Sequence, residues 1–208
     1  MPYTKTEIFN LALAEVPASA VVSDADNTPE DKACRRFYDA CLNELVDRFA
    51  WRFATKQGVL AEITNTRDEE WSYAYTVPSD CAKPLGLVVP KVQLQYPGDP
   101  GDASPSDLLN GRPIPYDLQG TTIFSNQYQA TLRYIRNDVV CADLPALVSK
   151  ALYLELAARV AGFLTQRDDR KAALLGLARE AREEAQVADR QKQPMVDERT
   201  PDWIRARA

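Results

Sequence analysis

The chain contains no histidine, and this absence removes the side chain that enzymes use most often as a general base. The Ser-His and Cys-His pairs of nucleophilic catalysis are excluded with it, as is the commonest metal ligand. The sequence also has no phosphate-binding loop, no GxGxxG or GxSxG motif, and no cluster with metal-ligand spacing. We therefore predict that the protein is not an enzyme and has no catalytic residue, cofactor or metal site.

An excess of positive charge is absent as well. The 25 Lys and Arg residues are outnumbered by 30 Asp and Glu, which gives a formal net charge of -5. Proteins that grip nucleic acid present a basic surface, so any DNA contact is expected to be weak. The first ten residues, "MPYTKTEIFN", lack the apolar run of a signal peptide, and the longest apolar segment is too short for a bilayer. We expect a protein of the cytoplasm that does not enter a membrane.

The four cysteines form no CxxC pair. Cys34 and Cys41 are seven residues apart, which places both on one face of a helix, and free cysteine is among the most buried residue types. We interpret them as buried thiols. The hydrophobic content of 45% is enough to fill the core of one sizeable domain, or of a domain with an insertion.

The segment 143–164 is the longest helical pattern, and it has almost no polar face. Glu155 and Arg159 stand at the i, i+4 spacing that lets them pair. A helix that is apolar nearly all round must be covered on most sides by other helices or other copies. The residues expected to pack there, within the bundle or between subunits, are Leu152, Leu156 and Val160.

Three further helices are predicted from their start signals and apolar stripes. Thr4 with Glu7 forms a capping box, and Thr28 precedes Pro29 at the first helical position. The second helix ends in "RFAWRFA", which we interpret as core packing and not as a platform for stacking nucleic-acid bases. The last helix begins near 168 and carries a narrow seam at steps of three and four, which includes Leu174, Ala178 and Ala181.

Between the second and third helices the apolar period changes to two, which is typical of half-buried strands. Strands are predicted in "GVLAEI", "WSYAYTVP" and "KVQLQYP", and "TTIFS" with "QATLRYIR" is predicted to form a hairpin. The residues 97–115 are dense in Pro, Gly, Asp and Ser, which predicts a long exposed loop.

These patterns predict a mainly α protein. Its core is expected to be a four-helix bundle formed by 1–54 and 138–193, with a small antiparallel β domain at 55–137 between the second and third helices. The residues 194–208 are expected to form an extended C-terminal tail. Trp, Ile and Arg together are what a docking segment uses to fill a pocket and anchor its rim, and the tail combines Trp203, Ile204, Arg205 and Arg207.

Several segments, taken in order along nearly the whole chain, resemble the head-to-tail adaptor of short-tailed bacteriophages, often called tail tubular protein A. They are "EIFNLAL", "CRRFYDACLNELVDRFAWRFA", "YAYTVPSDC", "ATLRYIR", "KALYLELAARVA" and "WIRAR". None of them is a catalytic signature, and the loop at 97–115 matches nothing in the family pattern.

The resemblance implies a structural virion protein, located in the neck of the particle and in the host cytoplasm during assembly. It implies a homo-oligomeric ring, expected to be a dodecamer, that docks under the portal protein and connects it to the tail nozzle or tubular protein. DNA would pass through the ring without specific binding. The alternatives are another neck component, such as a head-completion or stopper protein, and an enzyme without a recognisable motif.

Overall fold

The computed structural model describes residues 3–16, 18, 20, 21, 27–88, 114–164 and 168–192. They form two compact units, which we call the helical unit and the sheet unit. The helical unit contains the described residues within 3–37 and 145–192, and the sheet unit contains those within 38–144. The division therefore falls inside the second helix, whereas the sequence analysis placed the boundaries near 54 and 138.

Helix α1 (Lys5–Ala14) begins with the predicted capping box, which is confirmed. The Thr4 hydroxyl accepts a 3.2 Å hydrogen bond from the Glu7 amide, and the Glu7 carboxylate accepts one of 2.7 Å from the Thr4 amide. Two amides that would otherwise lack a helical partner are satisfied in this way. The helix turns four apolar side chains inward: Ile8, Phe9, Ala12 and Leu13.

Helix α2 (Pro29–Asp47) also begins where its cap predicts. The Thr28 hydroxyl accepts a 3.2 Å hydrogen bond from the Asp31 amide, and the Asp31 carboxylate accepts one of 3.3 Å from the Asn27 amide. The cap thus fixes the first turn of the helix. Cys34, Cys41 and Leu45 are fully buried, as the apolar stripe predicts.

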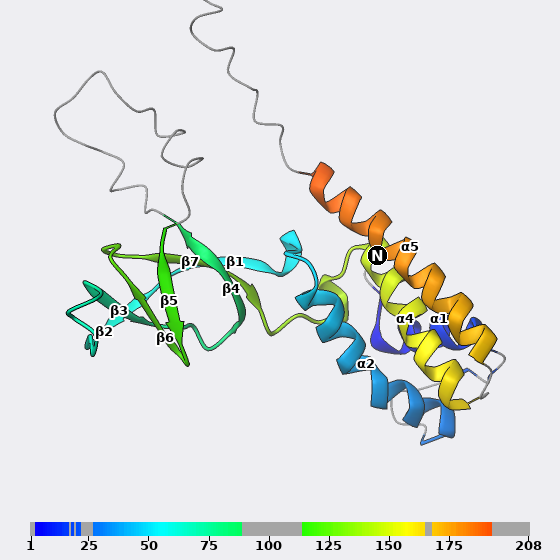
Figure 1. The fold of residues 1–208 in the computed structure, drawn as a ribbon. Coiled ribbons are helices and arrows are strands. Elements are labelled where there is room, and N and C mark those ends of the chain that lie inside the picture. Colours follow the sequence, from blue (N-terminus) through cyan, green and yellow to red (C-terminus); the bar gives the residue numbers. More distant parts are fainter. Residues whose placement is uncertain are drawn as a thin grey trace, which may run out of the picture. The chain divides into compact units, whose positions relative to one another are not determined.

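Helices α4 (Ala146–Leu164) and α5 (Asp168–Gln191) lie side by side in the helical unit (Figure 1). Eleven residues of α4 are buried, and α1 also packs against this helix, so protein covers it on several sides as its sequence predicts. None of the described helices is long and apolar enough to cross a membrane.

The sheet unit contains two antiparallel sheets. The first has three strands in the order β1 (Thr55–Val59), β7 (Thr131–Arg136) and β4 (Cys81–Val88). The register of β4 against β7 shifts on either side of Lys83 and Pro84, as expected where proline removes an amide donor from the ladder.

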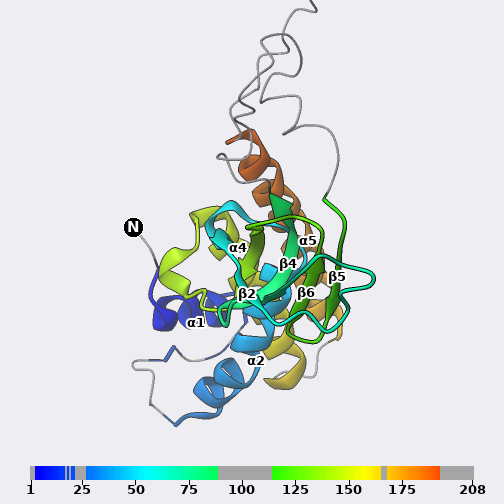
Figure 2. The same ribbon diagram turned by 90° about the vertical axis from the view of Figure 1, so that its left-hand side faces the viewer.

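The second sheet has four strands in the order β2 (Ala61–Ile63), β3 (Tyr73–Thr76), β6 (Thr122–Ser125) and β5 (Tyr116–Gln119). Figure 2 shows β5 beside β6, to which it is joined by a two-residue turn. Gly120 in this turn has a φ of 62°, a conformation that glycine adopts without strain. Tyr75 and Ile123 of this sheet form one apolar cluster with Leu132 of the first.

The predicted fold class, a four-helix bundle core carrying one small β domain, is wrong. Within the described residues the chain has four α-helices and seven strands in two antiparallel sheets, which is a mixed α/β fold. Three helices lie close to their predicted ranges, but α2 ends at Asp47, before the predicted end in "RFAWRFA", where only the short 3-10 helix Arg52–Ala54 follows. From Tyr38 onward α2 belongs to the sheet unit. The sequence analysis missed β4, which Pro84 and Gly86 interrupt, and β5, which follows directly on the proline-rich segment 97–115. The single strand predicted in "GVLAEI" is the end of β1 and all of β2, which lie in different sheets.

The predicted hairpin between "TTIFS" and "QATLRYIR" is also wrong. The first segment forms β6, which pairs with β3 and β5, and the second forms β7, which pairs with β1 and β4. Between them Gln129 has a positive φ of 49°, and the Ala130 carbonyl accepts a 2.9 Å hydrogen bond from the Leu60 amide. The chain therefore changes sheets at this point instead of folding back on itself.

Candidate functional site

The four residues predicted to dock on a portal, Trp203, Ile204, Arg205 and Arg207, lie outside the described residues. So do the predicted strand "KVQLQYP" and positions 97–113 of the predicted loop.

The six predicted packing residues all lie in the helical unit. On α4, Leu152, Leu156 and Val160 are fully buried. On α5 the exposed fractions of Leu174, Ala178 and Ala181 are 2%, 4% and 3%. The alanines allow the backbones of the two helices to approach closely, so these residues contribute to packing inside one subunit.

The predicted pair of Glu155 and Arg159 is present on α4, with 3.6 Å between the closest charged atoms. Arg182 of α5 approaches the same carboxylate at 3.9 Å. Glu155 is only 6% exposed, and a carboxylate in such a position needs cationic partners. One buried negative charge is thus shared between two arginines, and the group carries a net positive charge.

Sequence reasoning missed a surface where α4 ends. The rings of Phe37 and Phe163 meet edge to face with centroids 6.1 Å apart, and the Arg36 guanidinium lies 5.9 Å from the Phe163 centroid. Phe163 and Leu175 remain 50% and 44% exposed. We call this the Phe163 surface. It is hollowed by about 530 Å³, and its lining residues are Phe37, Arg159, Gly162, Phe163, Lys171 and Leu175.

The helical pattern of α4 contained a signal for this surface. Phe163 stands three positions after Val160 and seven after Leu156, so the apolar face of α4 continues to Phe163 in the last turn of the helix. Gly162 makes room for Lys171, since a Cβ at this glycine would lie 3.2 Å from the lysine Cδ. What the sequence did not indicate is that Phe37, from α2, would lie beside Phe163.

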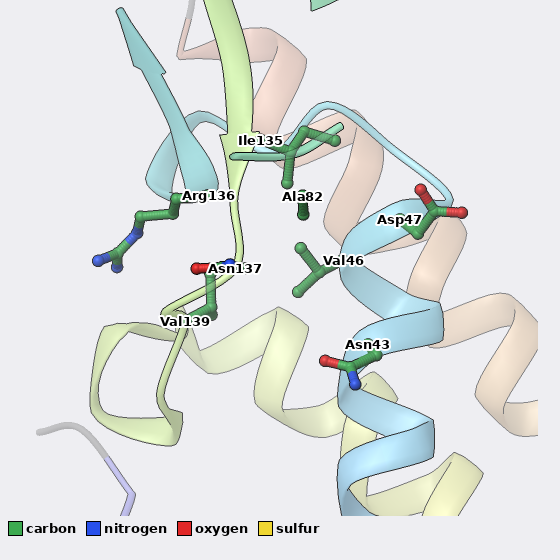
Figure 3. Close-up of a pocket in the computed structure, with 8 residues that line it drawn as sticks. All are labelled: Asn43, Val46, Asp47, Ala82, Ile135, Arg136, Asn137 and Val139. Carbon is green, nitrogen blue, oxygen red and sulfur yellow. The ribbon is translucent and has the colours of Figure 1, made fainter. Parts of the chain in front are cut away.

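The sheet unit has a cavity of about 370 Å³ where α2 ends, formed by α2, β4, β7 and the segment after β7. Figure 3 shows Val46, Ala82 and Ile135 turned toward its centre, whereas the Arg136 side chain points away. Arg136 pairs instead with Asp138 and Asp143. The cavity is mainly apolar and presents no nucleophile beside a base, so its geometry offers space for an apolar group and no catalytic arrangement.

A polar group on the three-stranded sheet links three elements. Asp80 accepts 2.8 Å hydrogen bonds from the Lys56 ammonium group and from the Tyr134 hydroxyl. The hydrogen bond from Lys56 lowers the pKa of Asp80 most, and the hydrogen bond from Tyr134 lowers it further. Burial of the Tyr134 hydroxyl, and to a lesser degree its hydrogen bond to Asp80, raises the pKa of Tyr134 to about 12. At neutral pH this group is an ionised carboxylate held by two donors.

The cysteines are free thiols; Cys34 and Cys41 are buried as predicted, whereas Cys81 and Cys141 are only partly buried. Burial and the nearby carboxylates of Asp31 and Glu30 raise the pKa of Cys34 to about 12, which makes this thiol unreactive at neutral pH.

Among the residues that the structure describes, no group of three or more His, Cys, Asp or Glu side chains could hold a metal ion. No protein-family model matches the sequence, and the search of curated proteins yields no match.

Proposed function

We propose that this chain is a structural virion protein, a subunit of a ring-forming head-to-tail adaptor that docks under a portal and leaves a channel for DNA. The observation that carries the proposal is the order of the family-like segments along nearly the whole chain. Five of them fall on described elements in sequence: α1, α2 with the following turn Arg52–Ala54, β3 with the start of β4, β7, and α4. A likeness spread over separate elements favours a relationship of the whole chain over a shared local pattern.

The apolar surface of the helical unit supports an oligomeric role. Four large apolar side chains on α4 and α5 are about half exposed: Phe163 at 50%, Leu175 at 44%, Leu177 at 48% and Val187 at 52%. Phe163 and Leu175 line one hollow, so part of this area is contiguous. Contiguous apolar surface of this kind is typical of sites that another protein covers.

We assign portal docking to the C-terminal tail from its sequence. Trp203 with Ile204 supplies the apolar anchor, and Arg205 with Arg207 would pair with acidic groups around it. Removing an anchoring Trp typically costs ~2 to 4 kcal/mol at each site. In a ring every copy loses the same anchor, and because the copies bind together, the losses add in the affinity of the whole ring for the portal.

Trp203→Ala should therefore abolish assembly onto portals while leaving the circular dichroism and melting of the free subunit unchanged. Co-sedimentation with portal would compare the parent, Trp203→Ala, and a chain ending at Gln193. Normal co-sedimentation of the shortened chain would place portal docking elsewhere. Negative-stain images of the mixtures separate the adaptor from a stopper protein, because an adaptor ring must contact both the portal and the tail.

A further inference from the structure

The Phe163 surface combines apolar area with positive charge. Arg36, Arg159 and Lys171 stand around Phe163, and Glu155, the carboxylate that pairs with Arg159, is shared with Arg182. Phe163 and Leu175 are both exposed, so the surface presents apolar side chains in the middle and cations at the rim. A complementary partner would bring carboxylates together with apolar atoms.

The loop between β2 and β3 in the sheet unit has this chemistry. Asp68, Glu69 and Glu70 follow one another at its tip, and all three are exposed. Trp71 comes next and is partly exposed. Ile63, at the end of β2 just before the loop, adds an apolar side chain that is 39% exposed.

This loop has a defined conformation in which Glu70 pairs with Arg67, and Asp68 and Glu69 are left facing solvent. The Arg67 carbonyl accepts hydrogen bonds of 3.1 Å from the Glu70 amide and 2.9 Å from the Trp71 amide. The Arg67 guanidinium pairs with Glu70 of the loop and with Asp117 of β5, and it lies 5.1 Å from the Phe124 ring centroid of β6. The positive charge of the loop is thereby held against the sheet, and Asp68 and Glu69 point into solvent.

The charge of the two units is also unequal. Over the described residues, the sheet unit carries seven Lys and Arg against eleven Asp and Glu, whereas the helical unit carries twelve against eleven. A contact between the sheet unit of one copy and the helical unit of the next is therefore less repulsive than a contact between two sheet units.

We propose that the β2–β3 loop of one copy docks on the Phe163 surface of the next copy. Asp68 and Glu69 pair with Lys171 and Arg36, and Trp71 covers part of the exposed Phe163 ring. The two surfaces are different, so the contact is head-to-tail, the kind that closes into a ring when the rotation between copies permits. This inference depends on the proposed function, because it assigns the contact from which that ring would be built.

The test reverses one charge on each side. Lys171→Glu and Glu69→Lys should each weaken self-association at least about tenfold, measured by sedimentation velocity over a concentration series. An equimolar mixture of the two variants should recover assembly, since the copies can alternate and each contact then joins opposite charges. Lys192→Glu makes the same charge change one residue after the end of α5; it is the matched control and should assemble like the parent. Both substituted positions are exposed, so the melting temperatures should not change.

The outcomes separate this contact from the ring itself. Assembly that persists in both single variants would overturn the docking contact and leave the ring proposal standing. Loss in both variants without recovery in the mixture would show that Lys171 and Glu69 contact other groups, which also overturns the contact. A parent that stays monomeric at millimolar concentration, alone and with portal, would overturn the ring and this contact together.

Discussion

Trp51 shows at the scale of one residue how the end of α2 is held. Its indole N–H donates a 2.8 Å hydrogen bond to the Leu45 carbonyl, one of the last carbonyls of the helix, which have no helical donor. The ring is fully buried and packs edge to face against Phe49, with centroids 4.8 Å apart. Because the indole is inaccessible, the structure supports the interpretation of this aromatic segment as core and not as a platform for nucleic-acid bases.

Trp51→Ala should lower the free energy of unfolding by ~3 to 5 kcal/mol, because it removes both the buried ring and the hydrogen bond. Trp51→Phe keeps most of the apolar contact and should cost about 1 to 3 kcal/mol for the unpaired carbonyl. Urea unfolding measures both. Phe53→Leu, at a partly exposed ring nearby, is the control and should have the smallest effect. Equal stability of Trp51→Ala and the parent would contradict this role.

The Asp80 group makes stability depend on pH in two directions. The pKa of Asp80 is lowered in the folded protein, so its contribution is present above the ordinary value of 3.8 and is lost as pH falls through the folded pKa. The pKa of Tyr134 is raised from 10.0 to about 12, so above pH 10 the unfolded chain loses this proton first and stability falls. Lys56, whose pKa is raised mainly by its hydrogen bond to Asp80, adds to the alkaline loss.

Tyr134→Phe should therefore reduce the decline in stability between pH 10 and 12 without removing it, because Lys56 still contributes. The measurement is the urea midpoint of the parent and the variant across this range. Identical alkaline slopes in the two proteins would show that Tyr134 does not titrate as described.

At the scale of elements, α4 is the helix on which the helical unit depends, because α1 and α5 both pack against it. Leu156→Asp would place an unpaired carboxylate at a fully buried position. This costs several kcal/mol, a large part of the ~5 to 15 kcal/mol by which a typical domain is stable against unfolding. We expect this variant to be insoluble or to melt far below the parent. Leu177→Asp makes the same change at a position of α5 that is 48% exposed, and it should melt like the parent. A thermal scan compares the melting temperatures of the two variants with that of the parent. A Leu156→Asp variant that melts like the parent would contradict the packing described for α4.

At the scale of the whole molecule, the net charge of -5 bears on DNA passage through the proposed ring. An acidic protein repels phosphate, so DNA could slide past it without sticking. We expect no measurable duplex binding at physiological salt, where nonspecific binders show dissociation constants of roughly 1 to 100 micromolar. Titration of a labelled duplex at low and then moderate salt tests this. Tight binding that survives moderate salt would instead indicate a nucleic-acid-binding protein.

The features that the sequence by itself determined are those that depend on neighbouring residues. The caps at Thr4 and Thr28 and the pairing of Glu155 with Arg159 all involve groups within four positions of each other. Local hydrogen bonds and the helical period are enough to specify them. The burial of α4 was predictable too, because a helix without a polar face has no stable exposed orientation.

Only the tertiary structure decided which strands pair and where the units divide. β6 and β7 are adjacent in the chain, yet they lie in different sheets, because β6 pairs with β3 and β7 pairs with β4, each from an earlier part of the chain. The Phe163 surface arises in the same way, since Phe37 and Phe163 meet across more than a hundred residues. Strand pairing and surface composition are set by contacts between distant residues, and an apolar period records only that a side chain is buried, not which partner buries it.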